Sequence, residues 1–239
     1  MEYYYTMSSC VDTNGKSIII KGDEYLHLTK VLRKKKGDII FVTDGELNVY
    51  ECSVDDIKSS EIICSILNHR HNVYEPELSL TLCLCLLKNH DRFEFAVEKA
   101  VEMGVHAIYP VISEFTINKS GLSDSKIKRL NKIALSAMKQ SQRCYLPEVF
   151  NAVSFKELDG ISKDFKNKIT MYEFEDAANK INSRILKNKC LLLIGPEGGF
   201  SKQEILQLKS SGWKTFSLGA RKLRAETAAV ISVYELLNI

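Results

Sequence analysis

The sequence predicts an α/β protein in two parts: a small β-rich domain at residues 1–72 and a larger domain at residues 73–239. In the first part, turn signals separate short segments of alternating polarity. After a polar stretch at 68–77, apolar runs alternate with amphipathic patterns, which is typical of a mostly parallel sheet with helices. The length of 239 residues, with 45% apolar and 26% charged side chains, fits one large or two modest domains and excludes collagen-like or wholly disordered chains.

Residues 1–72 are expected to form a barrel-like β domain. Asn-Gly and Asp-Gly between alternating segments are strong hairpin signals. The expected strands are Ser17–Ile20, Asp38–Thr43, Leu47–Val54 and Glu61–Leu67, the turns are Asn14-Gly15, Lys36-Gly37-Asp38 and Asp44-Gly45, and one helix covers Glu24–Leu32.

Residues 73–239 alternate between strands and helices. Asp91 with Glu94 three residues later predicts a capping box at the first helix, and Gly104 marks its end. The expected strands are Leu78–Leu87, Val105–Ile112, Cys190–Ile194 and Thr215–Leu218, and the later helices are Ile127–Met138, Ser201–Lys209 and Glu226–Leu237.

The glycine-rich segment Leu191–Ile205 (LLLIGPEGGFSKQEI) is the most informative stretch. An apolar strand ends at Gly195, and a second capping box, Ser201 with Glu204, begins a helix. Ligands of open α/β sheets bind beyond the carboxyl ends of strands, where glycines let the backbone approach them. The loop has no lysine for a phosphate and carries Glu197, which favours a neutral or cationic ligand. A tight turn without a ligand is the alternative for this loop alone.

The segment Leu218–Val230 (LGARKLRAETAAV) repeats the order strand, glycine, loop and helix. Three cations stand in the loop, and Glu226 begins the helix, where an acidic side chain suits the positive end of the helix dipole. A solvated loop, or an ion pair between Arg224 and Glu226, explains each charge singly. Two such loops after successive strands line the same sheet edge, and together they predict a binding site.

The net charge of +3 identifies no partner, but its distribution is uneven. Residues 1–72 carry 9 basic and 11 acidic side chains, yet five cations fall within Lys30–Lys36 (KVLRKKK). Such runs bind phosphate backbones, although many are simply solvated faces. The acidic surroundings lead us to favour RNA contact.

Seven scattered cysteines predict reduced thiols, with Cys83 and Cys85 in the core. The five histidines show no ligand spacing with them, so no metal site is expected. The amino terminus shows no signal peptide, and the apolar run at Leu78–Leu87 is far shorter than the roughly 20 residues that span a bilayer. We therefore expect a cytoplasmic protein with no membrane partner.

The two glycine loops, IGPEGGFSxxEI and LGxRxLRxETA, resemble those of the small-subunit (16S) ribosomal RNA uracil-N3 methyltransferases, the RsmE family of the SPOUT class. The resemblance extends over almost the whole chain. It includes His27-Leu28 with Val31-Leu32-Arg33, Gly37-Asp38, Asp44-Gly45, Asp91-Arg92, Glu98-Lys99, Glu102-Met103-Gly104-Val105, Gln140-Ser141 with Arg143, and Pro147-Glu148. Lys139, Asn89-His90 and Phe115 depart from the family pattern, and these departures concern RNA contacts rather than the cofactor site.

The resemblance implies a PUA-like β-barrel that binds RNA, followed by a SPOUT domain with a deep C-terminal trefoil knot. It implies binding of S-adenosylmethionine (AdoMet), a homodimer, and methylation of N3 of a uridine in 16S ribosomal RNA of the small subunit. The implied cofactor-binding residues are Leu193, Gly195, Glu197, Gly198, Gly199, Leu218, Gly219, Leu223, Arg224 and Thr227.

Loss of the uridine N3 proton leaves an anion, which a nearby cation stabilises. Arg224 is the first candidate for this cation and Arg221 the second, while Glu226 is a possible base. The expected RNA contacts are Lys30, Arg33, Lys34, Lys35, Lys36, Arg92, Lys99 and Arg143, of which the last three are equally well explained as surface charges.

Two other functions are compatible with these patterns. One is a nucleotide-binding enzyme that uses the glycine loop for phosphate. The other is an RNA-binding module that keeps the fold without catalysis. Titration with AdoMet and with ATP separates the first from a methyltransferase, and a methyl-transfer assay separates the second.

Overall fold

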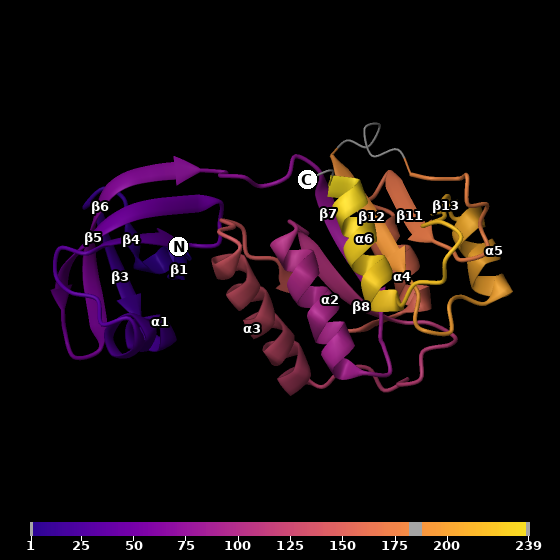
Figure 1. The fold of residues 1–239 in the computed structure, drawn as a ribbon, viewed down its shortest axis with the longest axis horizontal. Helices are drawn as coiled ribbons and strands as arrows, with labels where there is room; N and C mark the ends of the chain where they lie inside the picture. Colours follow the sequence, from indigo (N-terminus) through magenta and orange to yellow (C-terminus); the bar gives the residue numbers. More distant parts are fainter. Residues whose placement is uncertain (1, 182–187, 238–239) are drawn as a thin grey trace. The chain divides into compact units, whose positions relative to one another are not determined.

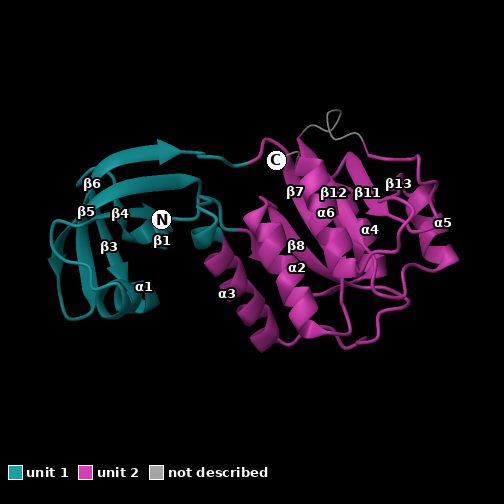
Figure 2. Ribbon diagram, in the orientation of Figure 1, with its two compact units in different colours: residues 1–75, 138–146 teal, residues 76–137, 147–239 magenta. Residues whose placement is uncertain are grey.

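The computed structural model describes residues 2–181 and 188–237. The chain divides into two compact units, shown in Figure 2. Unit 1 comprises residues 1–75 and 138–146, and unit 2 comprises residues 76–137 and 147–239. The sequence division at 72/73 assigns 138–146 to the second part, because local patterns do not reveal which distant residues a segment packs against.

Unit 1 is built on a six-stranded sheet in the order β1-β4-β5-β6-β3-β2 (Figure 1). Neighbouring strands are antiparallel, except that β1 pairs with β4 in parallel. Its elements are β1 (Tyr4–Tyr5), the 3-10 helix η1 (Ser8–Cys10), β2 (Val11–Asp12), β3 (Ser17–Lys21), α1 (Gly22–Leu26), the π-helix η2 (His27–Val31), β4 (Ile39–Thr43), β5 (Asn48–Ile57) and β6 (Glu61–His71).

The strand and hairpin predictions for unit 1 are confirmed. Residues Val11 and Asp12 pair with Ile18 and Ser17, which places Asn14-Gly15 in the connecting turn. The backbone N–H of Gly15 donates to Asp12 Oδ1 at 2.8 Å and holds that turn. The expected single helix at Glu24–Leu32 is instead a short α-helix that continues as a π-helix.

A buried ion pair attaches residues 138–146 to the rest of unit 1. Glu75 and Arg143 have side chains that are each 6% exposed, and Arg143 Nη2 lies 2.6 Å from Glu75 Oε2. The other oxygen of Glu75 accepts the backbone N–H groups of Cys144 and Tyr145 at 2.9 and 3.0 Å. The same segment begins near Lys139, which forms an ion pair with Glu24 of α1. Lys139, one of the departures from the family pattern, therefore has a partner inside unit 1.

Unit 2 contains a seven-stranded sheet in which the paired strands are parallel. The order is β10-β8-β7-β12-β11-β13, with β9 also paired to β8. The strands are β7 (Ser79–Cys85), β8 (Ala107–Ile112), β9 (Glu148–Val149), β10 (Val153–Ser154), β11 (Asn167–Met171), β12 (Lys189–Ile194) and β13 (Lys214–Phe216).

The helices that accompany this sheet are α2 (His90–Glu102), α3 (Asp124–Gln140), α4 (Phe155–Ser162), α5 (Lys202–Ser210) and α6 (Ala225–Leu237). Helix α6 packs against α2 and over β7 and β12 (Figure 1). Helix α3 begins in unit 2, and its last residues belong to unit 1. Because every strand runs the same way, the carboxyl ends of β11, β12 and β13 meet at one edge.

Most of the expected elements of unit 2 are confirmed, but the first capping box is wrong. Asn89 is the N-cap of α2 and accepts the N–H groups of Asp91 and Arg92, whereas Glu94 binds Arg129 of α3. The capping box Ser201–Glu204 is present as predicted. No pattern in the sequence had predicted β9, β10, α4 or β11. Of the five residues of β11, only the last three are buried.

The central strands form the core of unit 2, as their apolar runs predict. Cys83 and Cys85 of β7 are fully buried. Burial raises the pKa of the Cys85 thiol to about 12. The seven cysteines are free thiols, and within residues 2–181 and 188–237 no helix is long and apolar enough to cross a bilayer.

The Glu75–Arg143 pair gives the first testable prediction. Glu75→Ala leaves a buried guanidinium without its carboxylate and removes the acceptor of two backbone N–H groups. We expect a loss of about 3–5 kcal/mol of unit 1 stability in urea unfolding followed by circular dichroism. As the control, Lys21→Met breaks an exposed ion pair with Glu61 and should leave the midpoint nearly unchanged. Equal midpoints for the two variants would contradict this account of the buried pair.

Candidate functional site

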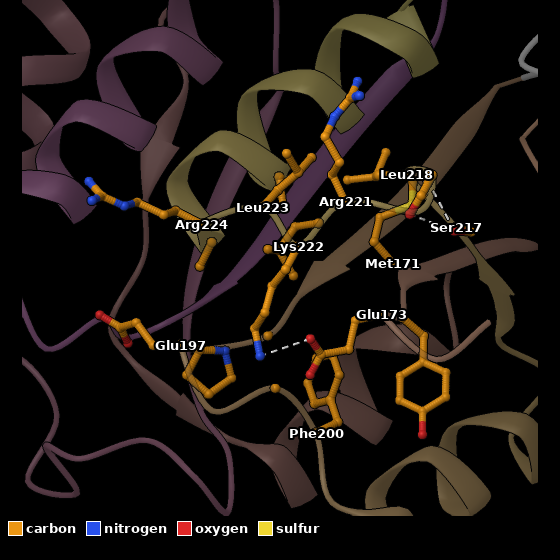
Figure 3. Close-up of a pocket in the computed structure, with 18 of the residues that line it drawn as sticks. Met171, Glu173, Glu197, Phe200, Ser217, Leu218, Arg221, Lys222, Leu223 and Arg224 are labelled. Atoms are coloured by element: carbon orange, nitrogen blue, oxygen red, sulfur yellow. Dashed lines mark hydrogen bonds and ion pairs between the residues drawn. The ribbon is translucent and has the colours of Figure 1, made fainter. Parts of the chain in front are cut away.

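A cavity of about 400 Å³ lies at the carboxyl ends of β11, β12 and β13 (Figure 3). Three loops line it, one after each strand, together with the start of α6. The lining residues are Met171, Tyr172, Glu173, Ile194, Gly195, Pro196, Glu197, Gly199, Phe200, Ser217, Leu218, Gly219, Ala220, Arg221, Lys222, Leu223, Arg224, Ala225 and Ala228. The two glycine loops of the sequence analysis therefore lie in the same cavity.

The loop between β12 and α5 leaves little room for side chains at its glycines. A Cβ at Gly195 would lie 3.0 Å from the ring of Phe200, which itself lines the cavity. Gly199 has a φ of +70°, and a Cβ there would lie 3.3 Å from Glu173 Oε1. The backbone of this loop is therefore what the cavity presents to a ligand, as the sequence analysis expected.

Glu197 is both a lining residue and an anchor. Its Oε1 accepts the backbone N–H of Lys88 at 3.0 Å, just beyond the end of β7. The carboxylate therefore fixes the glycine loop to the neighbouring strand. An anion at this position suits a cationic or neutral ligand better than a phosphate.

Three of the implied cofactor residues do not line the cavity. Leu193 is fully buried in β12, and its carbonyl accepts from Thr170 Oγ1 at 3.0 Å. Gly198 faces the loop after β8, where a Cβ would lie 3.0 Å from Phe115 Cβ. Thr227 is in the first turn of α6 and half-buried. Gly195, Glu197, Gly199, Leu218, Gly219, Leu223 and Arg224 all line the cavity.

The third wall of the cavity escaped the sequence analysis. Tyr172 and Glu173 follow β11, a strand that was not predicted, and so no signal placed them at the sheet edge. Glu173 Oε2 lies 3.1 Å from Lys222 Nζ, which joins the loop after β11 to the loop after β13 (Figure 3). The apolar lining residues Ile194 and Phe200 could have been predicted from the sequence, because both flank the predicted glycine loop.

The loop after β13 carries the cations. Gly219 has a φ of +104°, which favours glycine, and its N–H donates to Ser217 Oγ at 3.1 Å. Arg221 and Arg224 both line the cavity and are exposed. In Figure 3 Arg224 lies on the same side as Glu197, whereas the side chain of Arg221 extends away from the other labelled residues.

Glu226 lies outside the cavity lining. It is 7% exposed, and Oε1 is 3.6 Å from Arg92 Nε of α2, so its ion partner is Arg92 rather than Arg224. Its Oε2 is buried and has no hydrogen-bond partner. Local sequence patterns do not pair residues that lie more than a hundred positions apart.

The other predicted RNA residues occupy varied environments. Lys34 is half-buried, and the remaining cations of Lys30–Lys36 are exposed. Lys99 binds Glu102 and Glu98, and these carboxylates raise its pKa. Arg143 is the buried partner of Glu75. The structure therefore leaves the basic run open to solvent but gives Arg92, Lys99 and Arg143 partners within their own units.

The cavity combines apolar walls, backbone polar groups and charges of both signs. Its volume falls within the roughly 300–1,000 Å³ of small-molecule sites. Within the described ranges no group of three or more His, Cys, Asp or Glu side chains is arranged to hold a metal ion. Fold and cavity define a class: an α/β protein that binds a small organic ligand beyond the ends of parallel strands.

Comparison with known families identifies which member of that class this is. Residues 74–236 match the family model described as RNA methyltransferase domain, and residues 20–67 match the one described as RNA methyltransferase PUA domain. The chain belongs to the RNA methyltransferase family that includes ribosomal RNA small subunit methyltransferase E.

Individual relatives are similar to this protein over nearly its whole chain. Ribosomal RNA small subunit methyltransferase E of Mesomycoplasma hyopneumoniae is 36% identical, with 92% of this chain and 94% of the relative covered. The protein of the same name from Bacillus subtilis is 29% identical over 97% and 93%. A crystal structure of the Neisseria gonorrhoeae protein of this name, bound to S-adenosyl methionine, has a TM-score of 0.86 at 26% identity and covers 100% and 97% of the two chains.

The glycine loop gives the second prediction. Gly199→Ala places a Cβ at a φ of +70° beside Glu173, so we expect unit 2 to lose about 1–2 kcal/mol of stability. The matched control is Gly160→Ala in α4, where a Cβ has nothing within 4 Å and alanine should instead stabilise the helix by about 0.5–1 kcal/mol. Thermal unfolding measures both changes in stability, the loss in Gly199→Ala and the gain in Gly160→Ala. A neutral Gly199→Ala would show that the loop tolerates side chains.

Proposed function

We propose that this protein transfers a methyl group from AdoMet to N3 of a uridine in 16S ribosomal RNA of the small ribosomal subunit. The glycine-lined cavity beyond β11, β12 and β13 carries the proposal, because a relative of the same fold is bound to S-adenosyl methionine. Relatives named for the ribosomal RNA of the small subunit support the substrate. A ribosomal substrate also supports a cytoplasmic location.

The residues of the cavity fit this cofactor. Adenine needs apolar walls and backbone hydrogen-bond partners, which Leu218, Leu223 and the glycine loop supply. The carboxylates of Glu173 and Glu197 suit a cationic ligand, and Arg224 and Lys222 suit its carboxylate. When bound, AdoMet supplies an electrophilic methyl group on a sulfonium that becomes a neutral thioether.

We assign to Arg224 the stabilisation of the negative charge that forms on the uridine. The uridine imide must lose its N3 proton before that nitrogen forms the new bond to carbon, and the negative charge then spreads to the two carbonyl oxygens. A guanidinium at the rim of the cavity stabilises that charge. Arg221 is the second choice, because its side chain extends away from the other labelled residues (Figure 3).

Glu226 has a supporting role in this scheme. A base needs access to the proton, and the carboxylate of Glu226 is buried beside Arg92 and outside the cavity lining. We therefore assign Glu226 to hold α2 and α6 together, two residues after Arg224.

We also propose the C-terminal trefoil knot and the homodimer. In support of the knot, the chain crosses from β13 at the edge of the sheet to α6, which packs over β7 and β12 near its centre. In support of the dimer, Val230, Ile231 and Tyr234 lie on one partly exposed face of α6, and Tyr234 is 52% exposed. An apolar stripe of this kind is typical of a helix that packs against another chain.

Methyl transfer tests the proposed function and gives the third prediction. Small subunits or their RNA from a strain lacking the enzyme are incubated with labelled AdoMet, and the nucleosides are then separated. We expect label in 3-methyluridine, and titration should show binding of AdoMet but not ATP. Absence of 3-methyluridine with active controls would overturn the proposal.

The same assay tests the assignment of Arg224. Arg224→Met keeps the aliphatic stem and removes the charge, so kcat should fall by about 10²–10³-fold, as for other single groups that stabilise developing anions. Arg221→Met is the matched variant from the same loop and should lose less than about tenfold. A larger loss in Arg221→Met would reverse the two assignments.

The basic run gives the fourth prediction. Neutralising Arg33, Lys34, Lys35 and Lys36 together should weaken RNA binding and flatten its dependence on salt, because fewer counterions are released. The affinity for AdoMet should stay unchanged, since the run belongs to unit 1 and the cavity to unit 2. Filter binding at several salt concentrations measures the slope. Unchanged RNA affinity would show that the basic run Lys30–Lys36 does not contact RNA.

A further inference from the structure

The loop after β8, residues 113–121, exposes two large apolar side chains at the sheet edge that also holds the cavity. Phe115 is 45% exposed and Ile117 is 68% exposed. Exposed apolar side chains that gather beside a ligand site mark a candidate interaction surface, and an aromatic ring offers such a surface a flat face.

Buried hydrogen bonds hold this loop in place. Ser113 and Thr116 are each 2% exposed and bond to each other three times, with Ser113 N to Thr116 Oγ1 at 3.0 Å and Thr116 N to Ser113 O at 3.2 Å among them. Lys119 Nζ donates to the Ser113 carbonyl at 2.6 Å. Phe115 and Ile117 therefore project from a fixed turn, and the hydrogen bonds of that turn keep both side chains exposed to solvent.

The loop is also attached to the helix that follows the glycine loop. The backbone N–H of Glu114 donates at 2.8 Å to Oε1 of Glu204, a carboxylate only 6% exposed. The other oxygen of Glu204 completes the capping box of α5 by accepting from Ser201 N at 2.9 Å. One buried carboxylate thus sets the position of Phe115 relative to the start of α5.

Phe115 touches the cavity's glycine loop from its outer side. Its Cβ is the nearest atom to the missing side chain of Gly198, at 3.0 Å from an ideal Cβ, while Glu197 and Gly199 on either side line the cavity. In the sheet order β8-β7-β12-β11-β13, the cavity lies towards β11 and β13, whereas Phe115 lies towards β7 and β8. A long substrate that reaches the cavity from that side passes over the ring.

We propose that Phe115, with Ile117 two residues further along the loop, is a stacking platform for an unpaired base of the RNA substrate. Unpaired bases stack on exposed aromatic rings with about 1–3 kcal/mol each. Lys119, whose Nζ donates to the carbonyls of Ser113 and Glu114, places a positive charge in the same loop. The platform rests on the proposed function, since it needs RNA as the substrate.

Kinetics of methyl transfer test the platform and give the fifth prediction. Phe115→Ala should raise the KM for RNA by about 5–150-fold, which corresponds to the stacking free energy above, with the Kd for AdoMet unchanged. Phe115→Trp should restore KM, whereas Phe115→Leu should not, because leucine restores packing on Gly198 without an aromatic face. Phe95→Ala removes a phenylalanine of α2 with similar exposure, 47%, and should keep the wild-type KM.

A binding experiment tests the contact between residue 115 and RNA without catalysis. The chain has a single tryptophan, Trp213, which is 3% exposed, so the indole of Phe115→Trp is the exposed fluorophore. A single-stranded oligouridylate should quench its emission, and the wild-type emission should change little.

Three results would overturn the platform: a wild-type KM in Phe115→Ala, full rescue by Phe115→Leu, or emission of Phe115→Trp that depends on protein concentration without RNA. The last result would mean that a second copy of the chain covers the ring. Failure of the proposed function looks different, because the wild-type protein then forms no 3-methyluridine at all. In that case the oligouridylate titration still decides whether the ring stacks on bases.

Discussion

The steric restriction on the loop between β12 and α5 is the constraint on which the rest of unit 2 depends. Phe200, Glu173 and Phe115 each crowd one of its three glycines from a different direction. The first two belong to the cavity and the third to the outer side of the loop. A chain without side chains at these positions is therefore held between its own Phe200 and two neighbouring loops, and its polar backbone is left to face the ligand.

Carboxylate side chains connect this loop and the segments around it to distant parts of unit 2. Glu197 bonds to the end of β7, Glu204 bonds to the loop after β8, and Glu226 faces Arg92 of α2. In each of these carboxylates, one oxygen contacts a segment that is distant in the sequence. Glu204 and Glu226 are buried, and a buried carboxylate is costly unless it is paired, so these two favour one arrangement of the loops over others.

The parts of this fold that follow local rules were predictable, and those set by distant partners were not. The apolar run at β7, the capping box at Ser201 and the glycine loop are local patterns, and they gave the sheet edge and two of the three walls of the cavity. The third wall was missed because β11 is short and begins with a polar and a charged residue. Asn89 displaced the expected cap of α2 because Glu94 binds Arg129.

Unit 1 is discontinuous in sequence, and this affects how the chain emerges during synthesis. Domains generally fold as units as the chain is made, amino-terminal first. Glu75 closes the first stretch of unit 1, but Arg143, Cys144 and Tyr145 become available only some seventy residues later. A nascent chain that ends before them holds an unpaired carboxylate where the finished protein has an ion pair. The amino-terminal unit therefore reaches its final packing only after much of unit 2 has been translated.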